Sequence, residues 1–165
     1  MAITLIICES VIGNIGKGLK GKYDEMLAKD AVERISISRA ESERLRMRKS
    51  TDRGTDIALS MPAGTRLRHG DVVSLADRMI VVAIEPENVA VVRLKNGDAR
   101  TAVLVGHAIG NLHRPIRVEG DRIILPVQSD GEVEMLRRQL GPLAGNVDIT
   151  RDFVVFEPEA GAHEH

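Results

Sequence analysis

The chain of 165 residues contains little cysteine, few aromatic residues and almost no net charge. Its one cysteine, Cys8, excludes an internal disulfide and a cysteine-ligated zinc cluster. With two Phe, one Tyr and no Trp, the interior must consist of aliphatic side chains, which favours two small cores over one large core. A formal net charge of −1 argues against a protein that binds nucleic acid or a membrane surface.

The sequence also contains no apolar run long enough to span a bilayer. Glu9 ends the short apolar segment at residues 2–7, and no basic region precedes it, so this segment is not typical of a signal peptide. Gly13, Gly16 and Gly18 have the wrong spacing for a dinucleotide-binding loop. No Ser–His–Asp, Cys–His or paired-carboxylate arrangement stands out. We therefore expect a cytoplasmic protein that is not an enzyme.

Short predicted strands fill the first half of the chain. Apolar and polar residues alternate at residues 34–38 and 44–48, and further predicted strands lie at residues 56–60, 72–75 and 79–84. Alternation with a period of two indicates strands that bury one face. Many short strands joined by turns indicate a small sandwich or half-barrel, so we predict a β-rich N-terminal domain over residues 1–84.

The pattern changes after a predicted linker at residues 85–87. The second half contains, in order, a strand at 89–94, a helix from the N-cap Asp98 to about Leu112, a hairpin of 116–118 with 122–125, a helix at 132–140 that Ser129 or Asp130 can cap, and a strand at 146–156. This βαββαβ order predicts a ferredoxin-like domain over residues 87–157. Residues 158–165 are predicted to form a flexible tail that carries His163 and His165. The predicted fold class is therefore α+β.

Two histidines belong to the first predicted helix and its end. His107 and His113 are six residues apart, which places them roughly 120° apart around a helix, so they cannot chelate one ion as an i, i+4 pair does. Steps of three or four residues back from His113 trace one face of the predicted helix, and most side chains in this stripe are small: Ile109, Gly110, Gly106, Ala102 and Ala99. Each interior glycine costs a helix about 1 kcal/mol relative to alanine, which suggests a packing reason for both. One such reason is a twofold contact in which the stripe meets its own copy and two His113 imidazoles face each other.

Simpler explanations exist for the same residues. Gly106 and Gly110 could let the helix lie flat on its own sheet, and Asn111 in a left-handed conformation could end it. His113 would then only interact with the C-terminal dipole of the helix. The tail histidines could be solvated and without function, although a flexible segment can also bring them to a distant ion. Imidazole nitrogen suits nickel, copper and zinc.

The segment Gly110-Asn111-Leu112-His113-Arg114-Pro115 resembles the signature helix end of the urease accessory protein E (UreE) family of nickel metallochaperones, through Gly110, Asn111, His113 and Pro115. Similarity continues at residues 61–73, 119–123 and 156–159, and it covers most of the chain from about Ile35 onward. No single motif is very specific, but their order and spacing are.

The resemblance implies an N-terminal domain similar to the peptide-binding domains of J-type co-chaperones and a ferredoxin-like metal-binding domain. It also implies a homodimer that delivers Ni(II) to the urease apoprotein in a complex with the urease accessory GTPase (UreG). His113 of each subunit would hold one shared ion, and His163 or His165 would complete the ligand shell. His107 is a possible auxiliary ligand, and Zn(II) or Cu(II) could compete.

Two features depart from the family pattern. Leu112 stands where a basic residue is common, and the tail has only two histidines where some members have many. The departures favour one shared ion per dimer over bulk nickel storage. The main competing hypothesis is a metal-independent protein-interaction adaptor. The two hypotheses differ at His113, which an adaptor does not need.

Overall fold

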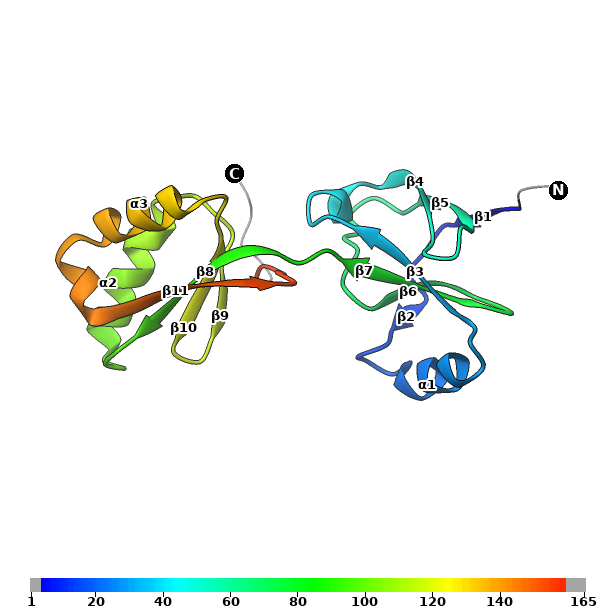
Figure 1. The fold of residues 1–165 in the computed structure, drawn as a ribbon, viewed down its shortest axis with the longest axis horizontal. Coiled ribbons are helices and arrows are strands. Elements are labelled where there is room, and N and C mark those ends of the chain that lie inside the picture. The colour runs from blue at the N-terminus through cyan, green and yellow to red at the C-terminus, as the bar shows by residue number, and fades with distance from the viewer. Residues whose placement is uncertain (1–3, 160–165) are drawn as a thin grey trace. The chain divides into compact units, whose positions relative to one another are not determined.

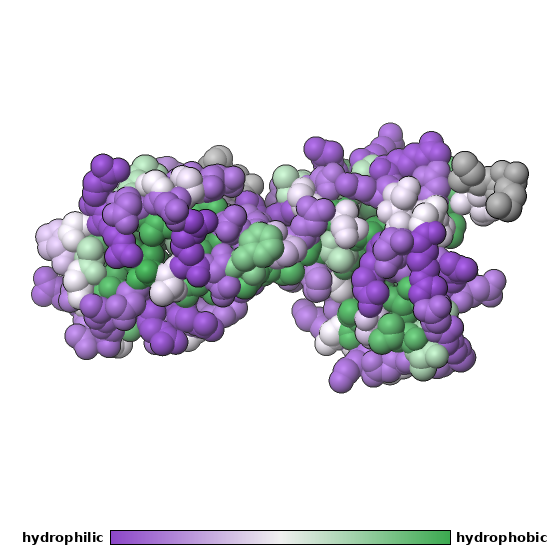
Figure 2. Space-filling model, viewed as in Figure 1, coloured by the Kyte–Doolittle hydropathy of each residue, from purple (hydrophilic) through white to green (hydrophobic). Residues whose placement is uncertain are grey.

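The computed structural model describes residues 4–159. The chain divides into two compact units, Met1–Glu85 (unit 1) and Pro86–His165 (unit 2) (Figure 1). Within the described residues no helix is both long and apolar enough to cross a membrane. The visible faces of both units are mostly hydrophilic, with apolar residues showing between the polar ones (Figure 2).

Unit 1 contains two sheets, which confirms the predicted β-rich N-terminal half. The first has the strand order β1-β5-β4 and consists of β1 (Leu5–Cys8), β4 (Arg46–Ser50) and β5 (Asp56–Ser60). The second has the order β2-β6-β7-β3 and consists of β2 (Gly13–Asn14), β3 (Val32–Ile37), β6 (Asp71–Leu75) and β7 (Met79–Ile84). A short 3-10 helix, η1 (Glu41–Glu43), precedes β4.

Unit 1 also contains a helix that the sequence pattern did not predict, α1 (Lys20–Ala28). Its only buried residue is Met26, and most of its other residues are charged or exposed. A helix that buries so little shows no clear apolar stripe in the sequence. Packing stabilises it instead, because Met26 contacts a cluster on the second sheet that contains Val32, Val72 and Met79.

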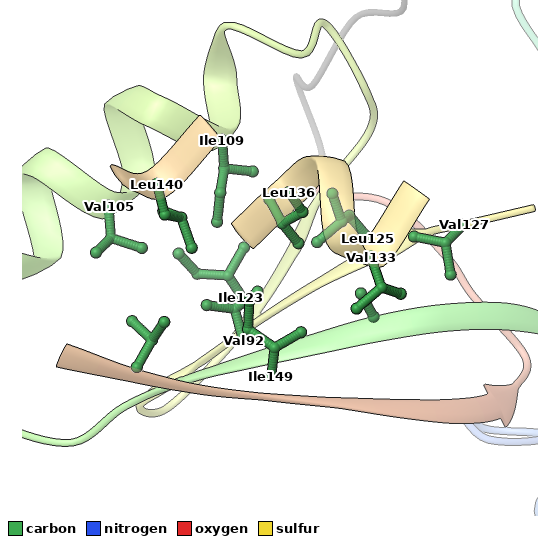
Figure 3. Packing of buried hydrophobic residues seen from close by; sticks show 12 residues of the cluster. Val92, Val105, Ile109, Ile123, Leu125, Val127, Val133, Leu136, Leu140 and Ile149 are labelled. Carbon is green, nitrogen blue, oxygen red and sulfur yellow. The ribbon is translucent and has the colours of Figure 1, made fainter. Parts of the chain in front are cut away.

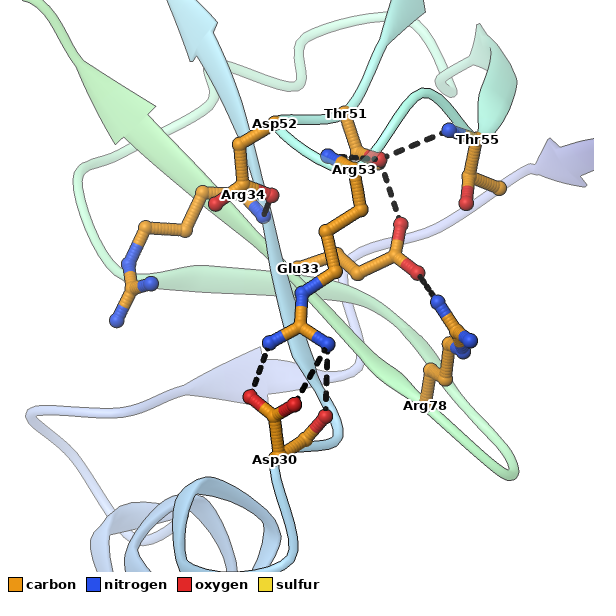
Figure 4. Close-up of polar contacts among 8 residues, drawn as sticks. All are labelled: Asp30, Glu33, Arg34, Thr51, Asp52, Arg53, Thr55 and Arg78. Carbon is orange, nitrogen blue, oxygen red and sulfur yellow. Dashed lines mark hydrogen bonds and ion pairs between the residues drawn. The ribbon is translucent and has the colours of Figure 1, made fainter.

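A buried carboxylate, Glu33, joins separate parts of unit 1 (Figure 4). Glu33 lies on β3 with no exposed surface, accepts a hydrogen bond from the Thr51 hydroxyl and pairs with Arg78 just before β7. The Thr51 hydroxyl oxygen in turn accepts the backbone N–H of Thr55 at 3.0 Å. These contacts fix the turn between β4 and β5 to the other sheet.

Unit 2 has the predicted ferredoxin-like topology. Its elements are β8 (Glu87–Leu94), α2 (Ala99–Gly110), β9 (Arg117–Glu119), β10 (Arg122–Pro126), α3 (Asp130–Leu140), the 3-10 helix η2 (Gly141–Asn146) and β11 (Val147–Val154). The strand order is β11-β8-β10-β9, and every pair of neighbours is antiparallel. This is the split βαβ arrangement, because β10 lies between the two strands that α2 connects.

Helices α2 and α3 cover one face of the unit 2 sheet (Figure 3). Val105 and Ile109 of α2 and Leu136 of α3 pack against Val92 and Ile123 of the sheet. The spacing of these residues fits both kinds of element. Val105 and Ile109 are four residues apart, which places them on the same side of a helix, and alternate residues of a strand face the same side of a sheet. This packing fixes which side of α2 faces inward and which side faces out.

Phe156 covers the opposite face of the same sheet. It follows β11, is 0% exposed, and packs with Val89 and Ile124, which alternate with the helix-facing residues of β8 and β10. The Arg117 guanidinium lies 5.8 Å from the centre of its ring. The chain therefore turns back over the sheet after its last strand.

Candidate metal-binding site

The candidate site begins with α2, whose start is well defined. Asp98 is the N-cap, and its carboxylate accepts the backbone N–H of Thr101 at 2.8 Å, as predicted. This hydrogen bond lowers the pKa of Asp98. Because Val105 and Ile109 are fixed in the core, the exposed side of α2 carries Val103, Leu104 and His107.

The outward side of α2 combines small and apolar residues. Val103 is 68% exposed and Leu104 is 41% exposed. A Cβ atom added at Gly106 or Gly110 would meet no atom of the described residues within 4 Å. The two glycines therefore do not let the helix approach its own sheet, which rules out that explanation. The predicted stripe needs one correction, because Ile109 points into the core and not along it.

His113 lies just beyond the end of this helix. Its backbone N–H donates to the Gly110 carbonyl at 3.0 Å, which continues the winding of the chain past the last helical residue. His113 itself has φ = +50°, the left-handed conformation, and it is exposed. The alternative that Asn111 takes this conformation is wrong, since Asn111 has φ = −64° and ψ = −13°. For a residue other than glycine the left-handed region costs roughly 1–2 kcal/mol, so neighbouring contacts must hold His113 there.

Arg114 provides such contacts. Its guanidinium donates to the Pro126 carbonyl at 3.2 Å and to the Glu132 carboxylate at 2.6 Å. The same carboxylate oxygen accepts the backbone N–H of Gln128 at 2.7 Å. Arg114 first and Gln128 second lower the pKa of Glu132. The residue next to His113 is thus attached to the end of β10 and to the first turn of α3.

The sequence did not lead us to Arg114 and Glu132, although one signal was present. Ser129 and Glu132 have the spacing of a capping box, in which a glutamate in the first turn reaches back to a backbone N–H. Here Glu132 reaches Gln128, one residue before the N-cap Ser129. The participation of Arg114 depends on tertiary structure and has no sequence signal.

The other histidines have different positions. His107 is exposed on α2, in the last turns of the helix. His69 belongs to unit 1, where its Nδ1 accepts the backbone N–H of Ile84 at 3.1 Å. His163 and His165 lie outside the described residues. Among residues 4–159, no group of three or more His, Cys, Asp or Glu side chains is placed to hold a metal ion.

The described part of one chain thus offers two exposed imidazoles at this helix end, that of His107 in the last turn of α2 and that of His113 just beyond the helix. Imidazole nitrogen is a suitable ligand for nickel, zinc and copper. Gly110 precedes His113 on the outward side of the helix, so the space around the helix end is open to a second molecule. A metal site built on His113 requires further ligands from the last residues of the chain or from another copy.

Comparison with known proteins gives matches along almost the whole chain. The sequence pattern of the UreE urease accessory protein N-terminal domain matches residues 9–85, and that of the C-terminal domain matches residues 87–165. Urease accessory protein UreE of Haemophilus influenzae strain PittEE is 33% identical over 125 residues, which are 74% of this chain and 64% of that protein. Urease accessory protein UreE 1 of Pseudomonas syringae pv. tomato is 28% identical over 149 residues, which are 89% of this chain and 99% of that protein.

Proposed function

Because the chain belongs to the UreE family of urease accessory proteins, which have a role in urease maturation, we propose that it is a nickel metallochaperone. In this proposal a homodimer binds one Ni(II) ion through His113 of both protomers and delivers it for assembly of the urease active site. Nickel is the cargo of the protein. The partners are the urease accessory GTPase and the urease apoprotein, and the setting is the cytoplasm.

The position of His113 is the observation that carries the proposal. An exposed imidazole in a costly backbone conformation, held by the contacts of Arg114, is typical of a functional residue. In an isologous dimer any residue near the twofold axis faces its own copy. The small outward surface of Gly106 and Gly110 allows a second helix end to approach closely, which would place two imidazoles beside one ion.

Additional ligands come from His163 or His165, with His107 as an auxiliary candidate. Two to four imidazoles make an incomplete shell for Ni(II), and an incomplete shell keeps the ion exchangeable, which suits transfer more than storage. Zn(II) and Cu(II) also bind imidazole, and Cu(II) does so more tightly than nickel. Selectivity for nickel would therefore have to come from geometry and from metal supply.

The test is a calorimetric nickel titration of the purified chain without an affinity tag, with its mass in solution measured in parallel. We expect one Ni(II) per dimer, and binding at least tenfold weaker after His113→Ala. His69→Ala is the matched control, because His69 lies in unit 1 and its removal is expected to leave the nickel affinity unchanged. Full-strength binding by His113→Ala, or no binding by the natural chain, would refute this function and favour the metal-independent adaptor.

The proposed dimer contact makes a separate prediction. Gly106→Leu adds a large side chain where the protomer itself has open space, so the helix remains folded and gains helix propensity. The same side chain would separate two facing helices. We expect Gly106→Leu to raise the dimer dissociation constant at least tenfold in sedimentation equilibrium, while Lys20→Leu, at an exposed position of α1, leaves it unchanged. A dimer that withstands Gly106→Leu would place the twofold contact elsewhere.

A further inference from the structure

A hollow with a volume of about 700 Å³ lies in unit 2 beside the edge strand β11. Phe156 covers the open face of the unit 2 sheet only around Val89 and Ile124. Further along this sheet, Val91 and Thr150 are among the residues that line the hollow, and the candidate metal ligand His113 is not. A hollow of this size lies within the range of sites for small ligands.

The charged side chains that line the hollow are mostly cationic. Four cations stand against the single carboxylate of Asp148, and they are Arg93, Lys95, Arg122 and Arg137. The chain as a whole has a formal net charge of −1, so this excess of positive charge is local. A local excess of positive charge concentrates anions at the hollow and not over the surface in general.

Two of these cations occupy unfavourable positions on the sheet. Arg93 of β8 and Arg122 of β10 are directly opposite each other in the antiparallel register. Side chains in opposite positions project from the same face of a sheet, and like charges there destabilise it. Lys95 follows Arg93 by two residues and adds a third positive charge to the hollow. An anion bound between the two arginines would remove their repulsion.

Each of the four cations also has a carboxylate of the chain nearby, but these ion pairs are weak. Their N···O distances are 3.0–3.6 Å, and every side chain in them is between 39% and 68% exposed; the pairs are Arg93–Asp121, Lys95–Asp148, Arg122–Glu119 and Arg137–Glu134. Ion pairs that are exposed to this extent contribute little to stability. A bound anion can therefore replace these carboxylates at little cost.

The lining residues restrict the kind of anion that fits. A guanidinium binds a phosphate or carboxylate group through two parallel N–H···O bonds. None of the residues that line the hollow is aromatic, so no side chain there can stack on a nucleobase. The Arg137 guanidinium donates to the Ile149 carbonyl of the edge strand β11 at 3.3 Å, which hinders the addition of a peptide strand. These features favour a small anion over a nucleotide or an extended peptide.

We propose that this hollow binds a small anion with two or more phosphate or carboxylate groups, one of which Arg93 and Arg122 share. The inference goes beyond the proposed function and does not depend on it, because His113 does not line the hollow. It assigns a ligand to the part of the unit 2 sheet that neither the helices nor Phe156 cover.

The experiment is a calorimetric titration of the metal-free full-length chain with inorganic triphosphate and, separately, with citrate. The protein must be free of metal because both anions also bind nickel. We expect a dissociation constant below about 1 mM for at least one of them, and the tighter of the two identifies phosphate or carboxylate as the preferred group. Arg93→Gln and Arg122→Gln should each weaken binding about tenfold, since each removes hydrogen bonds to a charged group.

Arg138→Gln is the matched control. Arg138 is exposed on α3 next to Arg137 and does not line the hollow, so this variant loses the same charge and should bind the anion unchanged. Asp148→Asn tests the site in the opposite direction, because it removes the carboxylate that lines the hollow and should tighten binding about threefold. Arg93→Gln relieves a repulsion, so the amides of β8 should keep their protection from hydrogen exchange.

Three results would overturn the site. They are the failure of both anions to bind, a loss in Arg138→Gln as large as that in Arg93→Gln, and weaker binding by Asp148→Asn. His113→Ala should bind the anion as the natural chain does. A failure of this anion site and a failure of the proposed nickel site are therefore distinguishable.

Discussion

The free energy of unfolding of unit 1 is expected to fall by about 3 kcal/mol when Glu33 is replaced by alanine. The replacement leaves the buried Thr51 hydroxyl without its acceptor, which costs about 1–3 kcal/mol, and it also leaves a cavity in a filled interior. Arg78 adds less, because its side chain is more than half exposed and water can solvate it. Glu33 thus stabilises unit 1 although it is charged and buried.

Tyr23 offers a direct measurement of this effect. It is the only tyrosine, and the chain has no tryptophan. Its side chain packs against the cluster in unit 1 that contains Met26 and Val72. Urea unfolding followed by tyrosine fluorescence therefore reports on unit 1 alone. Glu25→Ala is the matched control, since Glu25 has ion pairs with Lys22 and Lys29 that are exposed to solvent and therefore contribute little to stability. If Glu33→Ala and Glu25→Ala had equal effects, the buried network would not be stabilising.

The same residue makes unit 1 sensitive to acid. Burial raises the pKa of Glu33, but hydrogen bonds from Thr51 and Thr55 and the ion pair with Arg78 outweigh burial and lower it overall. A carboxyl whose folded pKa lies below its unfolded pKa contributes stability above the unfolded value, about 4.3, and loses this contribution as the pH falls through the folded value. The free energy of unfolding of the Glu33→Gln variant should therefore depend less on pH than that of the natural chain below about pH 4.3. This variant should keep part of the pH dependence, because other carboxyls, including Glu41 and Asp56, also have a lowered pKa.

Replacing Phe156 by alanine is expected to destabilise unit 2 by about 3–5 kcal/mol, the usual cost of removing a buried phenylalanine. Phe156 is 0% exposed and covers Val89 and Ile124 on the sheet face that the helices leave open. The replacement also removes the ring beside the Arg117 guanidinium. We therefore expect the residues after β11 to detach together with the ring.

Hydrogen exchange can test the Phe156 prediction strand by strand. The amides of β8 and β10 should lose protection in Phe156→Ala, whereas unfolding of unit 1, followed through Tyr23, should stay unchanged. Phe156→Leu keeps an apolar side chain over the sheet and is expected to cost about 1 kcal/mol. Unchanged protection of β8 and β10 in Phe156→Ala would contradict a role for Phe156 in the core.

The topology of unit 2 could be predicted because each of its elements has a clear local signal. Asp98 caps α2 as expected, and the spacing of Val105 and Ile109 matches one turn of a buried helix face. Helix α1 could not be predicted, because Met26 is its only buried residue and tertiary packing decides its conformation. Sequence periodicity therefore identifies elements that bury a full face and misses those that bury one or two side chains.

The candidate site could be predicted only in part for a similar reason. The resemblance identified His113, and the two glycines suggested an open helix side, but the left-handed conformation of His113 was assigned to Asn111 as one alternative. The contacts of Arg114 join it to residues that are 12 and 18 positions away in the sequence. Contacts of this range leave no periodic pattern, so only the folded chain reveals them.

Among the described residues, each of the three sheets takes all its strands from one side of Pro86. Glu85 still donates its backbone N–H to Ile37, whereas Glu87 already pairs with Val154 in β11. A single genetic crossover at the codon for Pro86 would therefore exchange one whole unit between two related genes without dividing a sheet. We expect the two halves of this chain to tolerate recombination at that codon and to be able to accumulate substitutions independently.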